Sequence, residues 1–394
     1  MNLSIVMPLG ELRGGGEISL LDLVRNGQGK GITWSVIFLE AGPLVQQVAD
    51  MGSRVHVVPS GRLRDIGRYA STVRRISALL REDRAELVVG WMWKASLYSS
   101  PAAILAGVPA IWYQLEAPLR PSLLERLAFM LPARGVMTVS RAAQARHARL
   151  WPRRPVHLVY PGVSLERFDP AILVSPEEAR RRLGLPCTGP LIGIVGRLQR
   201  WKGIHTVIEA MPRIMAQCPE AHCVIVGGKH QLEPNYPDYL AERSAALGLN
   251  DKITLAGLQI NVPIWMQAMD VIIHASDNEP FGMVVVEGMA LGKPMVAGAN
   301  GGPTEIVTHG VDGLFAPYEN TEALAAAVLR YLENPEFAGQ VGAAARRRAL
   351  DFSNARYAEN FVRVSCGLAG RSVPSVDGSG QEATLGMVSR PGRL

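Results

Sequence analysis

The chain has 394 residues, of which 48% are hydrophobic and 19% charged, with 40 glycines and 27 prolines. This composition is normal for a globular protein and excludes a disordered chain, and the length predicts two domains of ordinary size. No run of apolar residues is long enough for a membrane-spanning helix. The apolar residues 3–8 follow no basic leader, and the four cysteines show no metal-binding spacing, so we expect a protein of the reducing cytoplasm.

The net charge of +6 is unevenly distributed. Residues 1–170 contain 21 lysines and arginines against 13 aspartates and glutamates, an excess of +8, so the rest of the chain carries −2. Most of these cations are arginines between Arg54 and Arg154. A basic surface on one domain indicates an anionic partner, such as a phosphorylated acceptor or anionic lipid, and a merely solvated surface is the alternative. We expect no nucleic-acid partner, because the arginines are spaced singly along amphipathic helices and match no nucleic-acid-binding module.

Short strands alternate with helical segments over the first 160 residues. Between residues 63 and 80, apolar side chains recur at helical spacing with arginines between them, which predicts an amphipathic helix. Another helix is expected near residues 18–24. The strands are expected at residues 3–8, 32–39, 54–58, 86–90, 110–113, 136–140 and 156–160. Strands that alternate with helices in this way predict a parallel sheet with helices on both faces.

The alternation lapses between residues 165 and 189 and then starts again. This stretch is punctuated by prolines around one short basic helix, residues 176–183, and we interpret it as a linker. Beyond it, strands are expected at 191–195, 223–226, 252–255, 270–274 and 294–297, and helices at 204–217, 236–247, 262–269, from 303, at 321–332 and at 354–367. The sequence therefore predicts two doubly wound α/β domains, residues 1–170 and 186–350. Residues 369–394 have little apolar content and are expected to be disordered.

Three loops that follow predicted strands are rich in glycine. Open parallel sheets bind ligands where such loops leave the carboxyl ends of strands and enter helices. The loops 13–17 and 300–305 let a phosphate or sugar approach the backbone, where helix N–H groups favour an anion. In the loop 196–203, Arg197 and Lys202 are suited to neutralising a diphosphate, although each loop alone also fits a flexible segment with solvated cations. Neither first strand is followed by GxGxxG, which disfavours an NAD-dependent dehydrogenase.

Two glutamates eight residues apart, Glu279 and Glu287, flank a Pro-Phe-Gly turn and an apolar segment. Pro280 suits the first position of a helix, so we expect a helix over residues 281–291, ended by Gly292. Eight helical residues rise about 12 Å, which would let the two carboxylates contact different ends of one elongated polar ligand. A surface glutamate beside a helix-capping glutamate is the alternative interpretation.

With these motifs in order, the sequence resembles the retaining glycosyltransferase family 4 over about residues 1–368. The family's G-R-L-x-x-x-K-G loop corresponds to residues 196–203, its two-glutamate signature to residues 279–287, and its G-G-x-x-E segment to residues 301–305. Its N-terminal G-G-x-E loop corresponds to Gly15 and Gly16, with Glu17 one position early. The resemblance implies an α/β protein of the GT-B fold, with two doubly wound Rossmann-like domains facing across a cleft. It also implies that a C-terminal helix, residues 354–368, packs back on the first domain.

The resemblance further implies a nucleotide-diphosphate sugar as co-substrate, held by the second domain without a cofactor or metal ion. Arg197 and Lys202 would hold its diphosphate, Glu279 would face its sugar, and Glu287 would accept the ribose hydroxyls. The implied catalytic residues are Arg197, Lys202 and Glu279, and the donor-binding residues are Gly15, Gly16, Gly196, Phe281, Gly282 and Glu287.

One departure from the family affects the acceptor side. Many members carry a histidine at the end of a strand in the first domain, and the corresponding residues 89–96 contain none. Trp91 and Lys94 occupy the corresponding places, and Glu116 follows the next strand. Tryptophans and a lysine suit a sugar-stacking platform with an anion-binding point, and core packing of the tryptophans is the alternative.

These features predict transfer of a hexosyl unit, with retention, from a nucleotide-diphosphate sugar to a saccharide or lipid-linked acceptor in cell-envelope polysaccharide or glycolipid synthesis. The helix at residues 121–131 would lay an apolar face on the inner surface of the cell membrane, held there by the basic domain. A catalytically silent GT-B protein that binds a sugar nucleotide is the first alternative, and an epimerase or phosphorylase of similar architecture is the second. The sequence does not predict the nucleotide base, the sugar or the acceptor.

Overall fold

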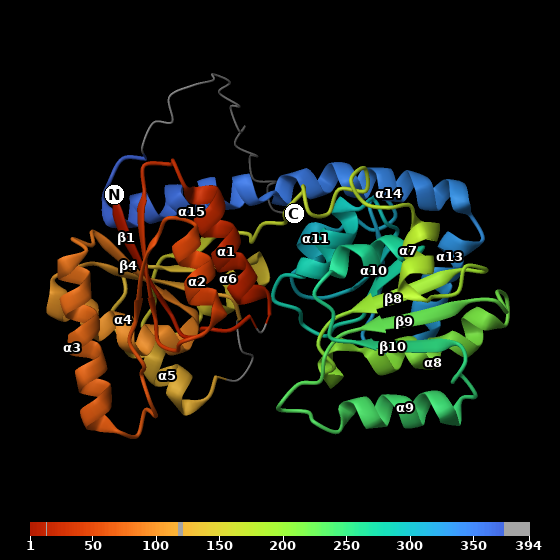
Figure 1. Cartoon of the computed structure of the whole chain (residues 1–394), viewed down its shortest axis with the longest axis horizontal. Helices are drawn as coiled ribbons and strands as arrows, with labels where there is room; N and C mark the ends of the chain where they lie inside the picture. Colours follow the sequence, from red (N-terminus) through yellow and green to blue (C-terminus); the bar gives the residue numbers. More distant parts are fainter. Residues whose placement is uncertain (13, 117–120, 374–394) are drawn as a thin grey trace, which may run out of the picture.

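The computed structural model describes residues 1–12, 14–116 and 121–373, which form two α/β domains side by side (Figure 1). Of the predicted tail, residues 374–394 lie outside the described residues, and helix α15 continues to Ala369. None of the helices in the described part of the chain is both long and apolar enough to span a membrane.

The first domain is built on a seven-stranded parallel sheet in the order β3-β2-β1-β4-β5-β6-β7. Strands β1 and β4 at its centre are buried along almost their whole length, as expected for apolar strands covered by helices on both faces. The strands are β1 (Asn2–Met7), β2 (Thr33–Phe38), β3 (Arg54–Val57), β4 (Leu87–Trp91), β5 (Ala110–Gln114), β6 (Val136–Thr138) and β7 (Val156–Leu158). The helices are α1 (Gly15–Gly27), α2 (Pro43–Asp50), α3 (Ile66–Glu82), α4 (Met92–Ala106), α5 (Leu123–Met130) and α6 (Arg141–His147).

The second domain repeats this plan on a six-stranded parallel sheet in the order β10-β9-β8-β11-β12-β13. Its strands are β8 (Leu191–Val195), β9 (His222–Val226), β10 (Ile253–Gly257), β11 (Val271–His274), β12 (Met295–Gly298) and β13 (Leu314–Ala316). Its helices are α7 (Pro176–Leu183), α8 (Ile204–Met215), α9 (Tyr236–Ala246), α10 (Val262–Ala268), α11 (Met283–Ala290), α12 (Pro303–Ile306), α13 (Thr321–Leu332) and α14 (Pro335–Ala349). In both sheets the strand order reverses at the first strand, β1 or β8, and ligand-binding crevices open at such points.

Helix α7 shows why the stretch between the domains is structured. Its N-terminus is capped by Ser175, whose hydroxyl accepts a hydrogen bond from the Glu178 N–H at 3.3 Å, and Gly184 ends it in the left-handed conformation. Arg180 then donates to the Ala268 carbonyl at 2.9 Å and to the Asp270 carboxylate at 2.6 Å. These contacts tie α7 to the second domain.

The last helix, α15 (Asn354–Ala369), returns the chain to the first domain. In Figure 1, α14 and α15 follow one another in blue along the top of the two domains. The ring of Phe361 on α15 packs 6.4 Å from Trp34, 6.1 Å from Trp91 and 5.6 Å from Tyr113, centroid to centroid. The final helix is therefore part of the first domain's core.

Two of the differences from the sequence prediction, at α14 and α11, have a clear structural cause. Helix α14 was not predicted, because its glycines interrupt the apolar pattern; one of them, Gly342, packs so closely on Gly292 that a methyl group there would lie 2.2 Å from the Gly292 carbonyl oxygen. Helix α11 begins at Met283, later than the predicted start at residue 281. The reason is Gly282, whose φ of 110° turns the chain before the helix, so Pro280 does not open it.

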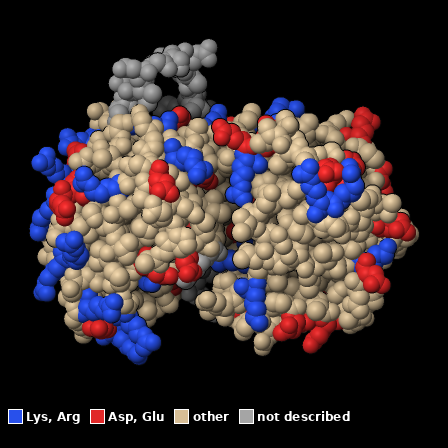
Figure 2. Space-filling model, viewed as in Figure 1, with Lys and Arg blue, Asp and Glu red and all other residues tan. Residues whose placement is uncertain are grey.

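The basic surface lies where the sequence places it. Lysine and arginine side chains gather on the outer side of the first domain, where α3 lies (Figure 2). Four arginines of α3 are exposed there, Arg68, Arg74, Arg75 and Arg81.

Candidate active site

The glycine-rich start of α1 faces the start of α11 across the groove between the domains, which Figure 2 shows. A methyl group on Gly15 would lie 3.6 Å from Cγ of Met283. The N-termini of these helices, one from each domain, thus approach each other beside the ends of β1 and β11. Helix N-termini expose unpaired N–H groups, so their convergence favours an anion between them.

Lys202, Glu279 and His274 form a cluster at the edge of the second sheet. The Lys202 Nζ lies 2.5 Å and the His274 Nε2 3.1 Å from the same oxygen, Oε2 of Glu279. All three side chains are largely buried. Burial opposes the charge of Glu279, but the Lys202 charge and the His274 hydrogen bond outweigh it and hold the pKa of Glu279 well below its usual range. Glu279 is therefore an ionised carboxylate with two polar partners.

The local fold explains how Lys202 reaches this cluster. The loop after β8 makes one 3-10 turn, Arg200–Lys202, and then turns at Gly203, whose φ is 71°. A side chain at position 203 would place its Cβ 2.2 Å from the Ala275 carbonyl oxygen. Only glycine therefore lets this loop approach the end of β11, where His274 and Glu279 lie.

The same loop carries Arg197 and begins at Gly196. Arg197 is exposed, and its charge adds to burial in lowering the pKa of the neighbouring His230. Glu233 stabilises the loop by accepting a hydrogen bond from the Arg200 N–H at 2.7 Å. Arg197 and Lys202, the two cations singled out from the sequence, thus lie in the same loop, which Glu233 stabilises.

Phe281 and Gly282 connect Glu279 to α11. The Phe281 ring is buried, with centroids 5.8 Å from both Tyr160 and Phe352. Because Glu279 lies before the turn at Gly282, the helical rise assumed from the sequence does not describe its separation from Glu287. Glu279 belongs to the loop and Glu287 to the helix.

Glu287 lies on α11 toward the first domain. It is partly buried, and this burial raises its pKa to about 7, with Arg167 opposing the rise and Asp22 of α1 adding to it. Burial likewise raises the pKa of Asp22 to about 6, against the charges of Arg25 and Arg167. The charge of Asp22, in the first domain, therefore contributes to the raised pKa of Glu287 in the second.

The prediction of a sugar-stacking platform at Trp91 is wrong. Its side chain is fully buried, with the ring edge-on to Tyr113 at 4.7 Å, because α15 closes over this end of β4. Lys94 lies half-buried in the first turn of α4, and Glu116 is exposed two residues after β5. The structure brings neither of these two into the Lys202 cluster by any described contact.

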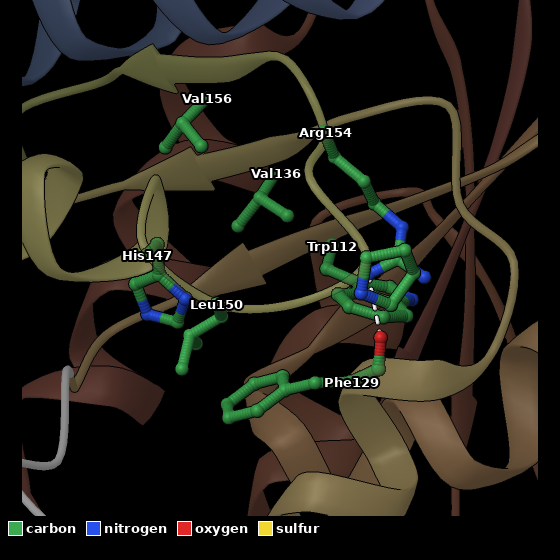
Figure 3. Close-up of a pocket in the computed structure, with 8 residues that line it drawn as sticks. Trp112, Phe129, Val136, His147, Leu150, Arg154 and Val156 are labelled. Carbon is green, nitrogen blue, oxygen red and sulfur yellow. Dashed lines mark hydrogen bonds between the residues drawn. The ribbon is translucent and has the colours of Figure 1, made fainter.

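The histidine that contacts the backbone of Glu116 has a structural role. His147 approaches the Glu116 carbonyl oxygen at 3.0 Å through Nε2 and packs edge-on against Phe129. It lines a small pocket between β5, β6 and α6, where Arg154 donates to the Phe129 carbonyl at 2.6 Å (Figure 3). Burial lowers the pKa of His147, so it is held neutral among apolar neighbours.

Sequence reasoning missed the contact made by Glu305. This carboxylate of α12 accepts hydrogen bonds from the N–H groups of Arg141 and Ala142 at 2.8 and 2.9 Å, and from the Tyr160 hydroxyl at 2.9 Å. Arg141 and Ala142 belong to α6 of the first domain, and Tyr160 to the segment that follows β7. Arg146 adds a further bond to Asn278 at 2.8 Å, so the loop around Glu279 is also tied to the first domain.

Comparison with known proteins identifies the family of both domains. Residues 13–167 match the family Glycosyltransferase Family 4, and residues 175–348 match Glycosyl transferases group 1. Two curated relatives are D-inositol 3-phosphate glycosyltransferases. That of Thermobispora bispora is 33% identical over 233 residues, 58% of this chain and 54% of the relative, and that of Corynebacterium urealyticum is 31% identical over 231 residues, 57% and 53%. The chain spans about half the length of the curated relatives it matches.

Solved structures confirm the GT-B fold. Anabaena HepE in complex with UDP-glucose superimposes with a TM-score of 0.81 and 25% identity, over 92% of this chain and 99% of that one. A glycosyltransferase from Rickettsia africae superimposes with a TM-score of 0.84 and 21% identity, over 94% and 99%.

Proposed function

Because the chain belongs to the group 1, family 4 glycosyltransferases, we propose that it moves a hexosyl unit from a nucleotide-diphosphate sugar to an acceptor with retention of configuration. The observation that carries this proposal is the Lys202–Glu279–His274 cluster, which lies beside the start of α11 and opposite the glycine-rich start of α1. A polar, largely buried cluster with a cation suits a ligand that has hydroxyls at one end and phosphates at the other.

In the proposed reaction, the bond between the sugar and the diphosphate breaks as negative charge grows on the departing nucleotide. Lys202 and Arg197 would stabilise that charge together with the N–H groups at the starts of α1 and α11. We propose that these groups supply the positive charge without a metal ion. Glu279, fixed by His274, would orient the sugar through its hydroxyls, and Glu287 would accept the ribose hydroxyls. Transfer needs no protein nucleophile in this scheme.

A uridine diphosphate sugar as the donor is supported by similarity to a solved structure. HepE was solved with UDP-glucose and shares 25% identity with this chain over 92% of its length, so uridine diphosphate sugars are the first donors to test. The name of the curated relatives contains D-inositol 3-phosphate, a phosphorylated inositol. The basic first domain fits an anionic acceptor of that kind or a lipid-linked sugar of the cell envelope.

The experiment that tests the function is release of the nucleoside diphosphate from donor sugars, with and without acceptors. The proposal predicts release from at least one donor, and faster release with the right acceptor. A catalytically silent binder is the second candidate, because the end of β4 carries the fully buried Trp91 and no histidine. It predicts donor binding with no release under any condition.

We also propose a peripheral membrane contact through α5. Four apolar side chains of this helix are exposed, by 74% at Leu123, 46% at Leu124, 48% at Leu127 and 54% at Met130, with Arg126 exposed among them. An apolar face beside basic residues suits an anionic membrane surface. Flotation with anionic vesicles is expected to weaken at high salt. Equal flotation with neutral vesicles would contradict the electrostatic part of the proposal.

A further inference from the structure

Two buried tryptophans hold the two ends of α1. The Trp91 indole Nε1 donates to the Gly16 carbonyl at 3.1 Å, in the first turn of the helix. The Trp34 indole Nε1 donates to the Gly27 carbonyl at 3.2 Å, in the last turn. Both rings also pack near Phe361 of α15. The helix that carries the glycine loop is thus fixed by a matched pair of hydrogen bonds.

Trp91 cannot contact a ligand directly. Its side chain has no exposed surface, and its ring is enclosed by Tyr113 and Phe361. The indole N–H is its only polar group, and a buried indole N–H needs an acceptor. That acceptor is the Gly16 carbonyl, so whatever Trp91 does for the donor site passes through the glycine loop.

Gly16 is also closely packed against the side chains of Leu115 and Met92. A methyl group on Gly16 would lie 2.7 Å from Cδ1 of Leu115 and 3.7 Å from Sδ of Met92. Met92 follows Trp91 with a φ of 64°, a conformation that is unusual for methionine and persists only where the surroundings enforce it. The first turn of α1 is therefore positioned by the hydrogen bond from the Trp91 indole and by packing against Met92 and Leu115.

We propose that Trp91 is a positioning residue: its indole N–H fixes the first turn of α1 so that the N–H groups there face the diphosphate of the donor. This inference rests on the proposed function, since it names the device that sets one side of the same site. Gly15, next to the bonded Gly16, faces Met283 of α11 across the groove. A small shift of the Gly16 carbonyl would therefore move the start of α1 relative to the start of α11, the two helix ends that would bind the diphosphate.

The test uses Trp34 as the matched control. Trp91→Phe and Trp34→Phe each remove one indole bond to α1, at opposite ends. A second variant replaces Trp91 with 3-benzothienylalanine, which keeps the ring shape and lacks only the N–H donor. Affinity for UDP, GDP and ADP is measured by calorimetry, and amide hydrogen exchange is followed in the first and last turns of α1 without ligand.

We expect both Trp91 variants to bind the preferred nucleoside diphosphate about tenfold more weakly, because a first turn that lacks this hydrogen bond must be ordered when the ligand binds, with faster exchange in that turn without ligand. Trp34→Phe is expected to keep wild-type affinity and to speed exchange in the last turn only. Unchanged affinity in the benzothienylalanine variant, or an equal loss in Trp34→Phe, would overturn the inference while leaving the proposed function intact. Wild-type protein that binds none of the three nucleotides would overturn both.

Discussion

Replacing Glu305 with glutamine is predicted to loosen the two domains from each other. The carboxylate accepts three hydrogen bonds from the far side of the boundary: from the Ala142 N–H on one oxygen, and from the Arg141 N–H and the Tyr160 hydroxyl on the other. Glutamine has one acceptor oxygen, and its NH₂ group would face an N–H donor where the second oxygen was. The substitution therefore removes the charge and at least one of the three bonds.

The size of the effect follows from these contacts. A hydrogen bond to a charged group contributes about 1.5–3 kcal/mol net. Losing one such bond and weakening the others should cost roughly 3 kcal/mol of the free energy that holds the domains closed. At about 1.4 kcal/mol per factor of ten, the ratio of open to closed molecules should rise roughly a hundredfold.

Distances between spin labels on the two domains measure this ratio directly. We expect Glu305→Gln to broaden the interdomain distance distribution toward longer values. The control is Glu322→Gln, which removes an equal charge from an exposed pair with Arg213 inside the second domain. Identical distributions for Glu305→Gln and the wild type, or equal opening in the control, would refute the reasoning.

Three further predictions concern individual groups. Because a ribose-binding carboxylate must be ionised and the pKa of Glu287 is about 7, donor affinity measured by calorimetry should increase from pH 6 to pH 8; a flat profile would contradict the assigned role. The same raised pKa means that the contribution of Glu287 to stability is complete below its unfolded pKa of 4.5 and is lost as the pH rises through 7, with Asp22 titrating alongside it. His274→Ala should lower kcat/KM for the donor about tenfold by freeing Glu279, and His274→Asn should restore part of it; equal activity in both variants and the wild type would exclude positioning. Burial raises the pKa of Asp83, but side-chain hydrogen-bond donors outweigh burial and hold this pKa below its usual value. Asp83 therefore stabilises the fold above the pKa it has in the unfolded chain, and this stabilisation is lost as the pH falls through its pKa in the folded protein. Asp83→Asn should therefore flatten the acid limb of the stability curve in urea denaturation, and an unchanged acid limb would contradict this.

Elements with local signals were predictable from the sequence. Helix α7 was predicted with its observed limits because Ser175, Pro176 and Gly184 supply a cap, a first position and a left-handed end. The β8 loop was recognised because glycines and two cations follow an apolar strand. In each case the deciding interactions lie within a few residues of one another.

Features that depend on distant segments were not predictable. The neighbours of Trp91 in the sequence do not decide between a sugar-stacking platform and core packing, because the helix that covers its ring begins more than 260 residues later. His274 was overlooked because its partner Glu279 lies beyond an irregular loop. Glu305 was recognised only as part of a motif, since its donors lie 145 to 164 residues away in the sequence.

The measurement that tests the central claim most directly is thermal stabilisation by nucleotide sugars, with Lys202→Ala as the site variant. Lys252→Ala is the control, because that lysine lies in the same domain and bonds the Pro219 carbonyl away from the cluster. A nucleotide sugar should raise the Tm of the wild type and of Lys252→Ala, and it should not raise that of Lys202→Ala. A wild-type Tm that no UDP-, GDP- or ADP-sugar shifts, or a full shift in Lys202→Ala, would contradict donor binding at the Lys202 cluster.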